Sequence, residues 1–461
     1  MRTALLLSLR WAPPVATALM VGAYLALLRS GRWTDEFFDF WAARTHGAGY
    51  WLHRVLDWSP RPVSEAFLWA YGDVVAVTGR PLIAPALLML WLILIASLLL
   101  PALRPGAEAG QRAADVAIGL GQLILCLSGT PVTEMYYWPA GAAAYMGTLS
   151  GVCVLLSVGS RPAPRAAALL MASGTSEVGA LFAVAYVGLR GLVAAHAVWR
   201  GRRRGRDAMV SGIWLVVPFT LAVVALALVG HGRMHTIEFA PVPGGSQGHL
   251  LASLVAGIRQ LSREAFGAAA VPVMEHLGAG LAVTVIFAAR AMPGRDVGAT
   301  WSVAVAAVAA AALSVTAAYY HFGLACCDRH VALRHGLLLI ACAAAGLGLR
   351  PLWSRTVGRW MRWDGFSPAA MSVLALVAFL PDLPRLWHDW RQQGQVTAAR
   401  DATWASGRHP GPAMVFHLPP DGAIVSGPGF PPGVYTRDGA ASTSQWPMLF
   451  FGKDRITVRP D

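Results

Sequence analysis

Long runs of apolar residues, separated by short polar gaps, make up most of this chain. A helix needs about 20 apolar residues to cross a membrane, and fewer where it is short or reentrant. The pattern predicts an all-α polytopic membrane protein with about 11 transmembrane helices. The expected spans are roughly residues 11–28, 81–103, 113–129, 142–158, 166–175, 178–199, 209–230, 271–289, 299–319, 331–349 and 367–381.

The stretch at 165–200 decides the topology, because "SGTSE" interrupts an apolar segment that is too long for one helix. If the stretch forms two spans, the loops at 104–112, 159–165, 200–206, 290–298 and 350–365 lie on the same side as the N-terminus. These loops hold fifteen arginines, as expected of cytoplasmic loops. If it forms one span, "RGRRRGR" at 200–206 faces outward. We therefore expect two spans and a cytoplasmic N-terminus.

Two polar regions then fall outside the membrane. The loop at 29–80 contains "FFDFWAARTHGAGYWLHRVLDW" and "SEAFLWAYGDVV", whose spacing predicts amphipathic helices at the membrane surface. The tail begins with an amphipathic segment and continues with short strand-like segments, "AMVFHL", "GAIVSG" and "DRITVRP". We expect a transmembrane module at 1–381 and a small mixed α/β extracytoplasmic domain at 382–461.

Composition supports a membrane protein and argues against a nucleic-acid partner. Of 461 residues, 56% are hydrophobic and 13% charged, whereas soluble domains carry about 25% charged residues. The formal charge is +13, but the arginines lie in gaps between apolar runs and act as topology signals. No nucleotide-binding or nucleophile-elbow motif occurs in the sequence.

Three acidic residues, Asp35, Glu36 and Asp39, directly follow the first apolar run. Helix capping explains one acid in a first turn, but three beside a bilayer exceed what a cap needs. On a helix Asp35 and Asp39 share a face, with Glu36 about 100° away. Such a cluster can bind a divalent cation and hold a hydroxyl for deprotonation.

Other acids and aromatic residues are expected on the same side. In "TPVTEMYYWPAG", Glu134 lies next to Tyr137 and Trp138, which form either an interfacial aromatic belt or a platform for a sugar ring. Glu177 lies in the "SGTSE" break. It is either a residue of the helix cap or a group facing a water-filled cavity, since ionisable groups at membrane depth are costly.

Basic residues at the outer ends of spans can bind phosphate. Arg61, Arg329 and Arg334 are expected there, and a guanidinium has the planar geometry that a phosphate group needs. The simpler alternative for Arg329 is an ion pair with the adjacent Asp328.

With these residues in place, the chain resembles the GT-C type of membrane glycosyltransferase. The resembling features are Asp35 and Glu36 after the first span, the long first outer loop, a short helix before Glu177, and the outer domain. More narrowly, four segments are similar to a bacterial family of polytopic proteins near that class: "WTDEFFDFWAARTHG", "TEMYYWPAGAAAY", "TSEVGAL" and "STSQWPMLFFGKDRITV".

The resemblance implies an inverting enzyme of the bacterial inner membrane. Its donor would be a polyprenyl-phosphate-linked sugar, and its acceptor a hydroxyl of a glycan, lipid or protein. Asp35 or Glu36 would be the catalytic base, supported by Asp39, and these acids would hold any divalent cation (Mg²⁺, Mn²⁺ or Ca²⁺). Arg329 or Arg334 would bind the donor phosphate, while Arg61, Glu134, Tyr137, Trp138 and Glu177 would complete the substrate site.

Two other classes remain open. A secondary transporter or flippase also suits many spans and a broken helix, although no inverted repeat is evident. A noncatalytic membrane scaffold would use the acids only as helix caps. The concentration of acids outside the bilayer favours the transferase.

Overall fold

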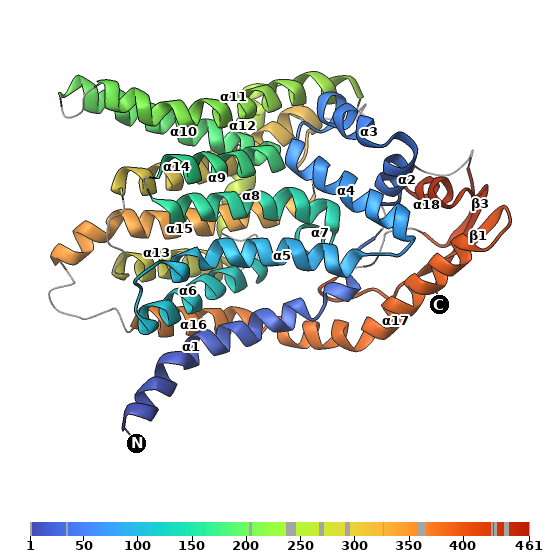
Figure 1. The fold of residues 1–461 in the computed structure, drawn as a ribbon, viewed down its shortest axis with the longest axis horizontal. Coiled ribbons are helices and arrows are strands. Elements are labelled where there is room, and N and C mark those ends of the chain that lie inside the picture. The colour runs from blue at the N-terminus through green and yellow to red at the C-terminus, as the bar shows by residue number, and fades with distance from the viewer. Residues whose placement is uncertain are drawn as a thin grey trace.

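The structure is a computed structural model. It describes residues 2–33, 36–159, 161–201, 205–236, 246–266, 272–290, 296–325, 327–356, 366–425, 427, 431–437 and 442–460. Within these ranges the chain is a bundle of long helices with a small mixed α/β domain at its C-terminal end (Figure 1).

Each predicted span overlaps a helix of the bundle. The helices are α1 (Arg2–Leu25), α5 (Ile83–Leu99), α6 (Ala109–Leu127), α8 (Pro139–Val158), α9 (Pro162–Thr175), α10 (Glu177–Trp199), α11 (Gly205–Thr236), α13 (Pro272–Ala289), α14 (Val297–Phe322), α15 (Asp328–Thr356) and α16 (Phe366–Phe379). Hydropathy therefore located the bundle helices, and the "SGTSE" interruption together with the arginine distribution located the break that separates α9 from α10.

The expected number of about 11 spans is not confirmed. Within the described residues, seven segments are long and apolar enough to cross a membrane, and the bent pair α16 and α17 would add an eighth. The other three expected spans fall short for separate reasons. Helix α9 has 14 residues, α6 includes the charged residues Arg112 and Asp115, and the part of α13 whose side chains the structure describes is the short apolar segment Gly278–Ala289. The long apolar helices indicate a multi-pass membrane protein, with seven or eight candidate spans among the residues that the structure describes.

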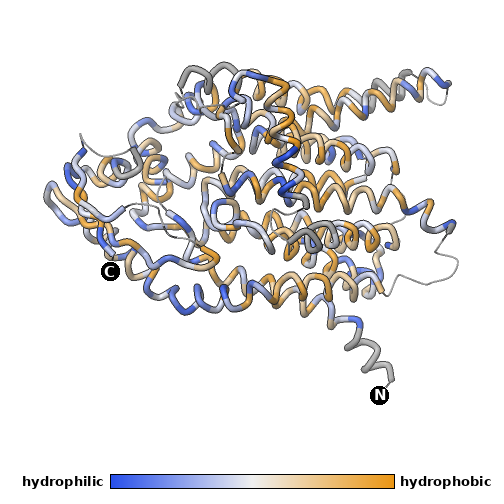
Figure 2. Tube along the Cα trace, turned by 180° about the vertical axis from the view of Figure 1, so that it is seen from behind, coloured by the Kyte–Doolittle hydropathy of each residue, from blue (hydrophilic) through white to orange (hydrophobic). Residues whose placement is uncertain are grey.

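The two ends of the bundle differ. The N-terminus lies at the end where α10 leads into α11, whereas the C-terminal domain lies at the opposite end (Figure 1). In Figure 2, hydrophobic residues concentrate along the bundle helices, and the C-terminal domain is more hydrophilic. We call the end that carries the C-terminal domain the cap end.

Shorter helices gather at the cap end. The predicted amphipathic loop forms α2 (Glu36–His46), α3 (Ala48–His53), a π-helical turn (Arg54–Trp58) and α4 (Pro62–Thr78), and is preceded by the 3₁₀ turn η1 (Leu28–Ser30). Helices α7 (Thr133–Tyr136) and α12 (Leu250–Phe266) complete the set. At Gly47 the backbone has a φ of 58°, which a glycine adopts without steric cost and which separates α2 from α3.

The C-terminal domain consists of α17 (Leu383–Arg408), β1 (Ala413–Leu418), β2 (Gly433–Thr436), α18 (Ser442–Phe451) and β3 (Arg455–Pro460). The sheet order is β1-β3-β2, with β1 parallel and β2 antiparallel to β3. Hydroxyls of α17 protect the open edge of β1: Ser406 accepts from the N–H of Val415 at 2.7 Å, and Thr403 accepts from that of His417 at 2.8 Å. Strands β1 and β3 confirm the predictions for "AMVFHL" and "DRITVRP".

The predicted strand "GAIVSG" is wrong for the part that the structure describes. Residues 423–425 form a bend, because the buried carboxylate of Asp389 in α17 takes their backbone N–H groups. Asp389 accepts from Ala423, Ile424 and Val425 at 2.5, 2.9 and 2.8 Å. These N–H groups are thus unavailable for a β ladder.

Reporter fusions test the two-sided arrangement. A fusion after residue 207 is expected on the cytoplasmic side and one after residue 381 on the outer side, because the arginine-rich loops share the side of the N-terminus. Green fluorescent protein should fluoresce only at 207, and alkaline phosphatase should be active only at 381. The same compartment for both sites would contradict this topology.

Substitution of Asp389 tests the bend. Asp389→Asn should destabilise it, because hydrogen bonds to a charged group contribute about 1.5–3 kcal/mol. We expect faster proteolysis near residues 419–425 in the purified protein. The control is Asp401→Asn on the exposed face of the same helix; equal proteolysis of the two variants would refute the role of Asp389.

Candidate functional site

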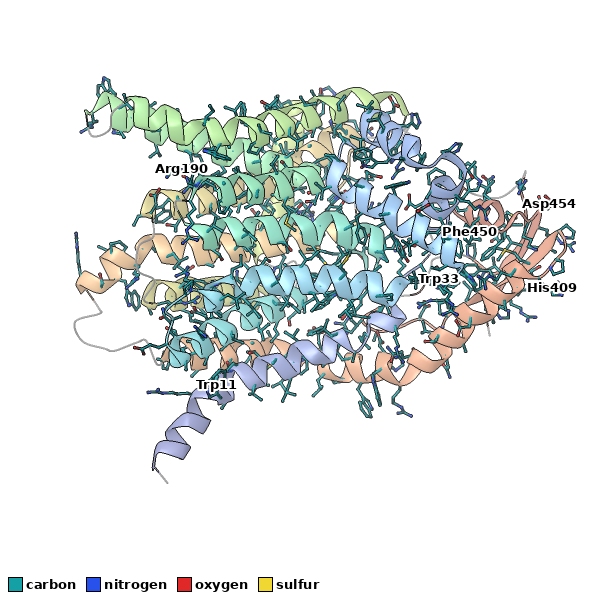
Figure 3. All side chains as sticks on the ribbon, viewed as in Figure 1. Trp11, Trp33, Arg190, His409, Phe450 and Asp454 are labelled. Atoms are coloured by element: carbon teal, nitrogen blue, oxygen red, sulfur yellow. The ribbon has the colours of Figure 1, made fainter. Side chains whose placement is uncertain are left out.

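Charged side chains from α2, α4, α7, α10 and α15 lie at the cap end of the bundle. Figure 3 places Trp33 and Phe450 at the junction between the bundle and the C-terminal domain, whereas Trp11 and Arg190 lie toward the other end. The candidate site consists of three clusters near this junction.

The first cluster joins two arginines to one carboxylate. The Glu134 side chain accepts from Arg32 Nη1 at 3.1 Å through Oε1, and from Arg329 Nη1 at 3.2 Å through Oε2. Both guanidinium groups also stack over the Trp138 ring, 5.5 Å from its centroid for Arg32 and 5.3 Å for Arg329. Arg32 and Arg329, which are almost 300 positions apart in the chain, thus share the Glu134 carboxylate and the Trp138 indole.

A tight turn after the first span positions Arg32. The backbone N–H of Arg32 donates to the carbonyl of Tyr137 at 2.7 Å. At the preceding Gly31, a Cβ atom would lie 2.5 Å from Leu87 Cδ1 and 3.0 Å from the Tyr137 carbonyl oxygen. Only glycine fits this approach, which brings the start of the loop after α1 against α7.

The break between α9 and α10 positions Glu177 in the second cluster. Ser176 has an extended backbone, and its hydroxyl accepts from the N–H of Gly179 at 3.0 Å, which caps α10. Thr148 of α8 holds the break through hydroxyl contacts with Ser176 at 2.6 Å and Thr175 at 3.0 Å. Glu177 therefore begins α10, where the helix dipole favours a carboxylate.

Arg61 pairs with Glu177 in this cluster. The Nε of Arg61 donates to Oε2 of Glu177 at 2.7 Å, and the guanidinium lies over the Tyr145 ring at 5.7 Å. Burial alone would lower the pKa of Arg61, but the Glu177 carboxylate and Tyr145 raise it above its usual value. Tyr145 Oη in turn lies 3.0 Å from His330 Nε2. Since His330 adjoins Arg329 in α15, the second cluster connects to the first.

The third cluster surrounds the acidic helix α2. Asp35 lies outside the described residues. Glu36 is fully buried, and Asp39 is 8% exposed. Burial raises the pKa of Tyr71 in α4 well above its usual value, and the nearby Glu36 raises it further. This places the Glu36 carboxylate in a dry environment, which fits an acid that supports its neighbours better than one that meets a substrate directly.

Asp39 belongs to a chain of alternating charges. Burial alone would lower the pKa of Arg54, but Glu65 and Asp39 raise it. Arg54 Nε lies 3.1 Å from Glu65 Oε2, so α2, the π-helical turn and α4 are joined electrostatically. In the part of the chain that the structure describes, no three His, Cys, Asp or Glu side chains gather as metal ligands. The predicted metal pair includes Asp35 and thus lies partly outside that region.

Two predicted substrate residues have structural roles instead. Tyr137 is fully buried, and its hydroxyl donates to the carbonyl of Tyr24 at 2.9 Å, so its ring has no exposed face for a sugar. Arg334 is 2% exposed, and its Nε and Nη2 donate to Glu264 of α12 at 2.6 and 2.5 Å. Glu264 thus occupies the Nε and Nη2 donors of the guanidinium, which a phosphate would need for a two-point contact.

The structure adds residues that sequence patterns did not identify. The site also includes Arg32, Arg54, Glu65, Tyr145 and His330. One available signal was the position of Arg32 immediately before the acidic segment, and another was the acid in "SEAF". No local signal pairs Tyr145 with His330, because the two residues are 185 positions apart.

In comparisons with known proteins, no family model, curated protein or solved structure matches this chain.

The Arg61–Glu177 pair should support the fold of the cap end. Replacing one partner (Arg61→Met or Glu177→Gln) leaves a largely buried charge or polar group and should cost about 3 kcal/mol, whereas the double variant should recover part of the loss. Unfolding in a titration with sodium dodecyl sulfate, followed by circular dichroism, measures both.

The exposed His53–Asp57 pair is the control for this experiment. Its side chains are 68% and 62% exposed, so Asp57→Asn should cost less than about 1 kcal/mol. Single variants of Arg61 or Glu177 that are no less stable than Asp57→Asn would show that the buried pair does not hold the break.

Proposed function

We propose that the protein is a membrane glycosyltransferase that moves a sugar from a polyprenyl-phosphate carrier to an acceptor hydroxyl at the cap end. The observation that carries this proposal is the turn after the first span. It contributes Arg32 to the two-arginine cluster and leads within four residues to Glu36 of the buried acidic helix. A cationic site for a leaving phosphate and a group of acids for an incoming hydroxyl thus begin in one segment.

In this proposal the acids act on the acceptor. An acceptor hydroxyl needs a base at neutral pH, and general-base catalysis contributes about 10²- to 10⁴-fold. Asp35 is the proposed base, and Glu36 and Asp39 orient it and any divalent cation (Mg²⁺, Mn²⁺ or Ca²⁺). Direct displacement by the hydroxyl inverts the anomeric centre.

The arginines act on the carrier. Arg329 and Arg32 face the phosphate that departs with the lipid, and preorganised positive charge at a departing oxyanion is often the largest single contribution to catalysis. Both guanidiniums lie over the Trp138 ring. The Arg61–Glu177 pair, with Tyr145 and His330, lies beside this cluster on the side of α8 and α10.

One observation favours the alternative of a transporter or flippase. Asp115 of α6 pairs with Arg290 at the end of α13, and both side chains are at most 8% exposed. Arg290 and Gln122 line a cavity together with residues of α5, α8 and α15. Buried ionisable groups in a membrane bundle often mark a substrate path. This pair lies in the first turns of α6, toward the end opposite the cap, whereas the transferase site needs only the cap end.

Substitution of the two acids tests the transferase. Asp35→Asn should lower transfer of labelled sugar from polyprenyl phosphate by about 10²-fold or more, because the base is lost. Glu36→Gln should lower it less, since Glu36 is buried. Each variant is compared at equal membrane abundance.

Asp73→Asn is the matched control, because Asp73 is an exposed acid in α4 of the same outer loop. Its transfer rate should equal that of the unmodified protein. Full transfer activity in both Asp35→Asn and Glu36→Gln would remove the catalytic assignment of the acidic helix.

A further inference from the structure

The Arg32–Glu134–Arg329 cluster has more positive charge than its carboxylate can neutralise. Glu134 gives one oxygen to each arginine, at 3.1 and 3.2 Å, so the three side chains together carry one net positive charge. The other arginine pairs at the cap end each match one guanidinium to one carboxylate: Arg61 with Glu177, Arg54 with Glu65, and Arg334 with Glu264.

The cluster is also partly exposed to solvent, and its arginines have more N–H donors than the cluster has hydrogen-bond acceptors. The side chains of Arg32, Glu134 and Arg329 are 21%, 20% and 26% exposed, so a ligand can reach them without unfolding of the surrounding helices. The buried Nε of Arg32 has no hydrogen-bond acceptor among the described atoms. Each guanidinium carries several N–H donors in a fixed plane, and here one carboxylate uses a single nitrogen of each.

Stacking keeps the two guanidiniums in place when the carboxylate leaves. Both lie over the ring of Trp138, which is 8% exposed, and their edges remain for an anion. A phosphate oxygen pair can replace the two carboxylate oxygens, because both groups accept from arginine in the same planar arrangement.

We propose that the Arg32–Arg329 pair binds a phosphate monoester dianion in preference to a phosphodiester monoanion, and that Glu134 is an internal competitor that weakens the binding of both. A ligand must displace the Glu134 carboxylate from both arginines. A monoanion only replaces one negative charge by another, whereas a dianion also neutralises the surplus positive charge. The binding free energy of the ligand is therefore most favourable when its phosphate carries two negative charges.

This selectivity follows the charge change of the proposed reaction. A carrier-linked sugar is a phosphodiester with one negative charge. When the bond between the anomeric carbon and the phosphate oxygen breaks, its electron pair stays on that oxygen. The carrier leaves as a monoester with a second negative charge, and the proton of the acceptor hydroxyl goes to the base. Interactions that strengthen as negative charge develops on the phosphate lower the activation barrier of the transfer. Interactions that bind donor and product equally do not.

The inference rests on the proposed function for the identity of the ligand, but its test needs no sugar transfer. Isothermal titration calorimetry of the purified protein in nanodiscs at pH 8, where a monoester with a second pKa of about 6 is a dianion, would compare three probes. Dodecyl phosphate is the monoester, methyl dodecyl phosphate is the diester, and inorganic phosphate is the soluble dianion.

We expect the unmodified protein to bind dodecyl phosphate about tenfold or more tightly than methyl dodecyl phosphate, a difference of about 1.4 kcal/mol. In Glu134→Gln both probes should gain affinity by a similar factor, because displacing the carboxylate costs either ligand the same, so the ratio should stay at about tenfold or more. Arg32→Gln and Arg329→Gln should each weaken monoester binding about tenfold. Arg385→Gln is the control, since Arg385 is an exposed arginine that pairs with Asp382 at the start of α17.

Several results would overturn the inference. Equal binding of monoester and diester by the unmodified protein would do so without any variant. Weaker diester binding in Glu134→Gln would show that Glu134 supports the ligand rather than competes with it. Inorganic phosphate binding as tightly as dodecyl phosphate would overturn the assignment to a lipid-linked ligand. If the predicted selectivity appears but no sugar is transferred, the phosphate site stands and the proposed function fails.

Discussion

The cap end depends on one buried cation, Arg400 of α17. Its guanidinium donates to the backbone carbonyls of Arg29 and Gly31, each at 2.8 Å, and lies over the Trp33 ring at 5.5 Å. A turn that leaves a membrane helix and is covered by protein must satisfy its carbonyl groups, and Arg400 does so from the opposite end of the sequence. The same side chain acts electrostatically on Glu36. The turn that carries Arg32 and leads to the acidic helix is therefore fixed by the C-terminal domain.

Aromatic packing extends this constraint from the turn to the whole of α2. Phe37 contacts Trp404, Phe450 and Phe451 with ring centroids 5.7–5.9 Å apart, and Trp33 stacks on Phe416 of β1 at 5.3 Å. Such rings bury large apolar areas, so the domain covers the acidic helix on one side while α4 covers it on the other. Glu36 is fully buried beside these rings, and the exclusion of water strengthens the interactions of its carboxylate with neighbouring charges.

The charges of the site act as a connected set, because each element contributes one partner to a neighbouring element. Arg32 reaches from the turn after α1 to α7, Arg61 from the start of α4 to α10, and Arg334 from α15 to α12. In a bundle whose interior is apolar, an unpaired buried charge is costly, so the pairs hold the cap-end termini of the helices in register. Where two arginines share Glu134, the balance is incomplete, and the site retains a positive charge for an anion.

The sequence by itself determined the helices of the bundle, the break at Ser176 and the strands β1 and β3, because hydropathy and periodicity are local properties of the chain. It also predicted that Glu134, Glu177, Arg61 and Arg329 lie on one side of the bundle, and the structure places all four at the cap end. Only the tertiary structure decided which of these groups meet. It buried Tyr137 against Tyr24, paired Arg334 with Glu264, turned residues 423–425 toward Asp389 and brought Arg32 to Glu134. Partners of this kind lie tens to hundreds of residues apart, and no local pattern encodes a contact that exists only when helices pack.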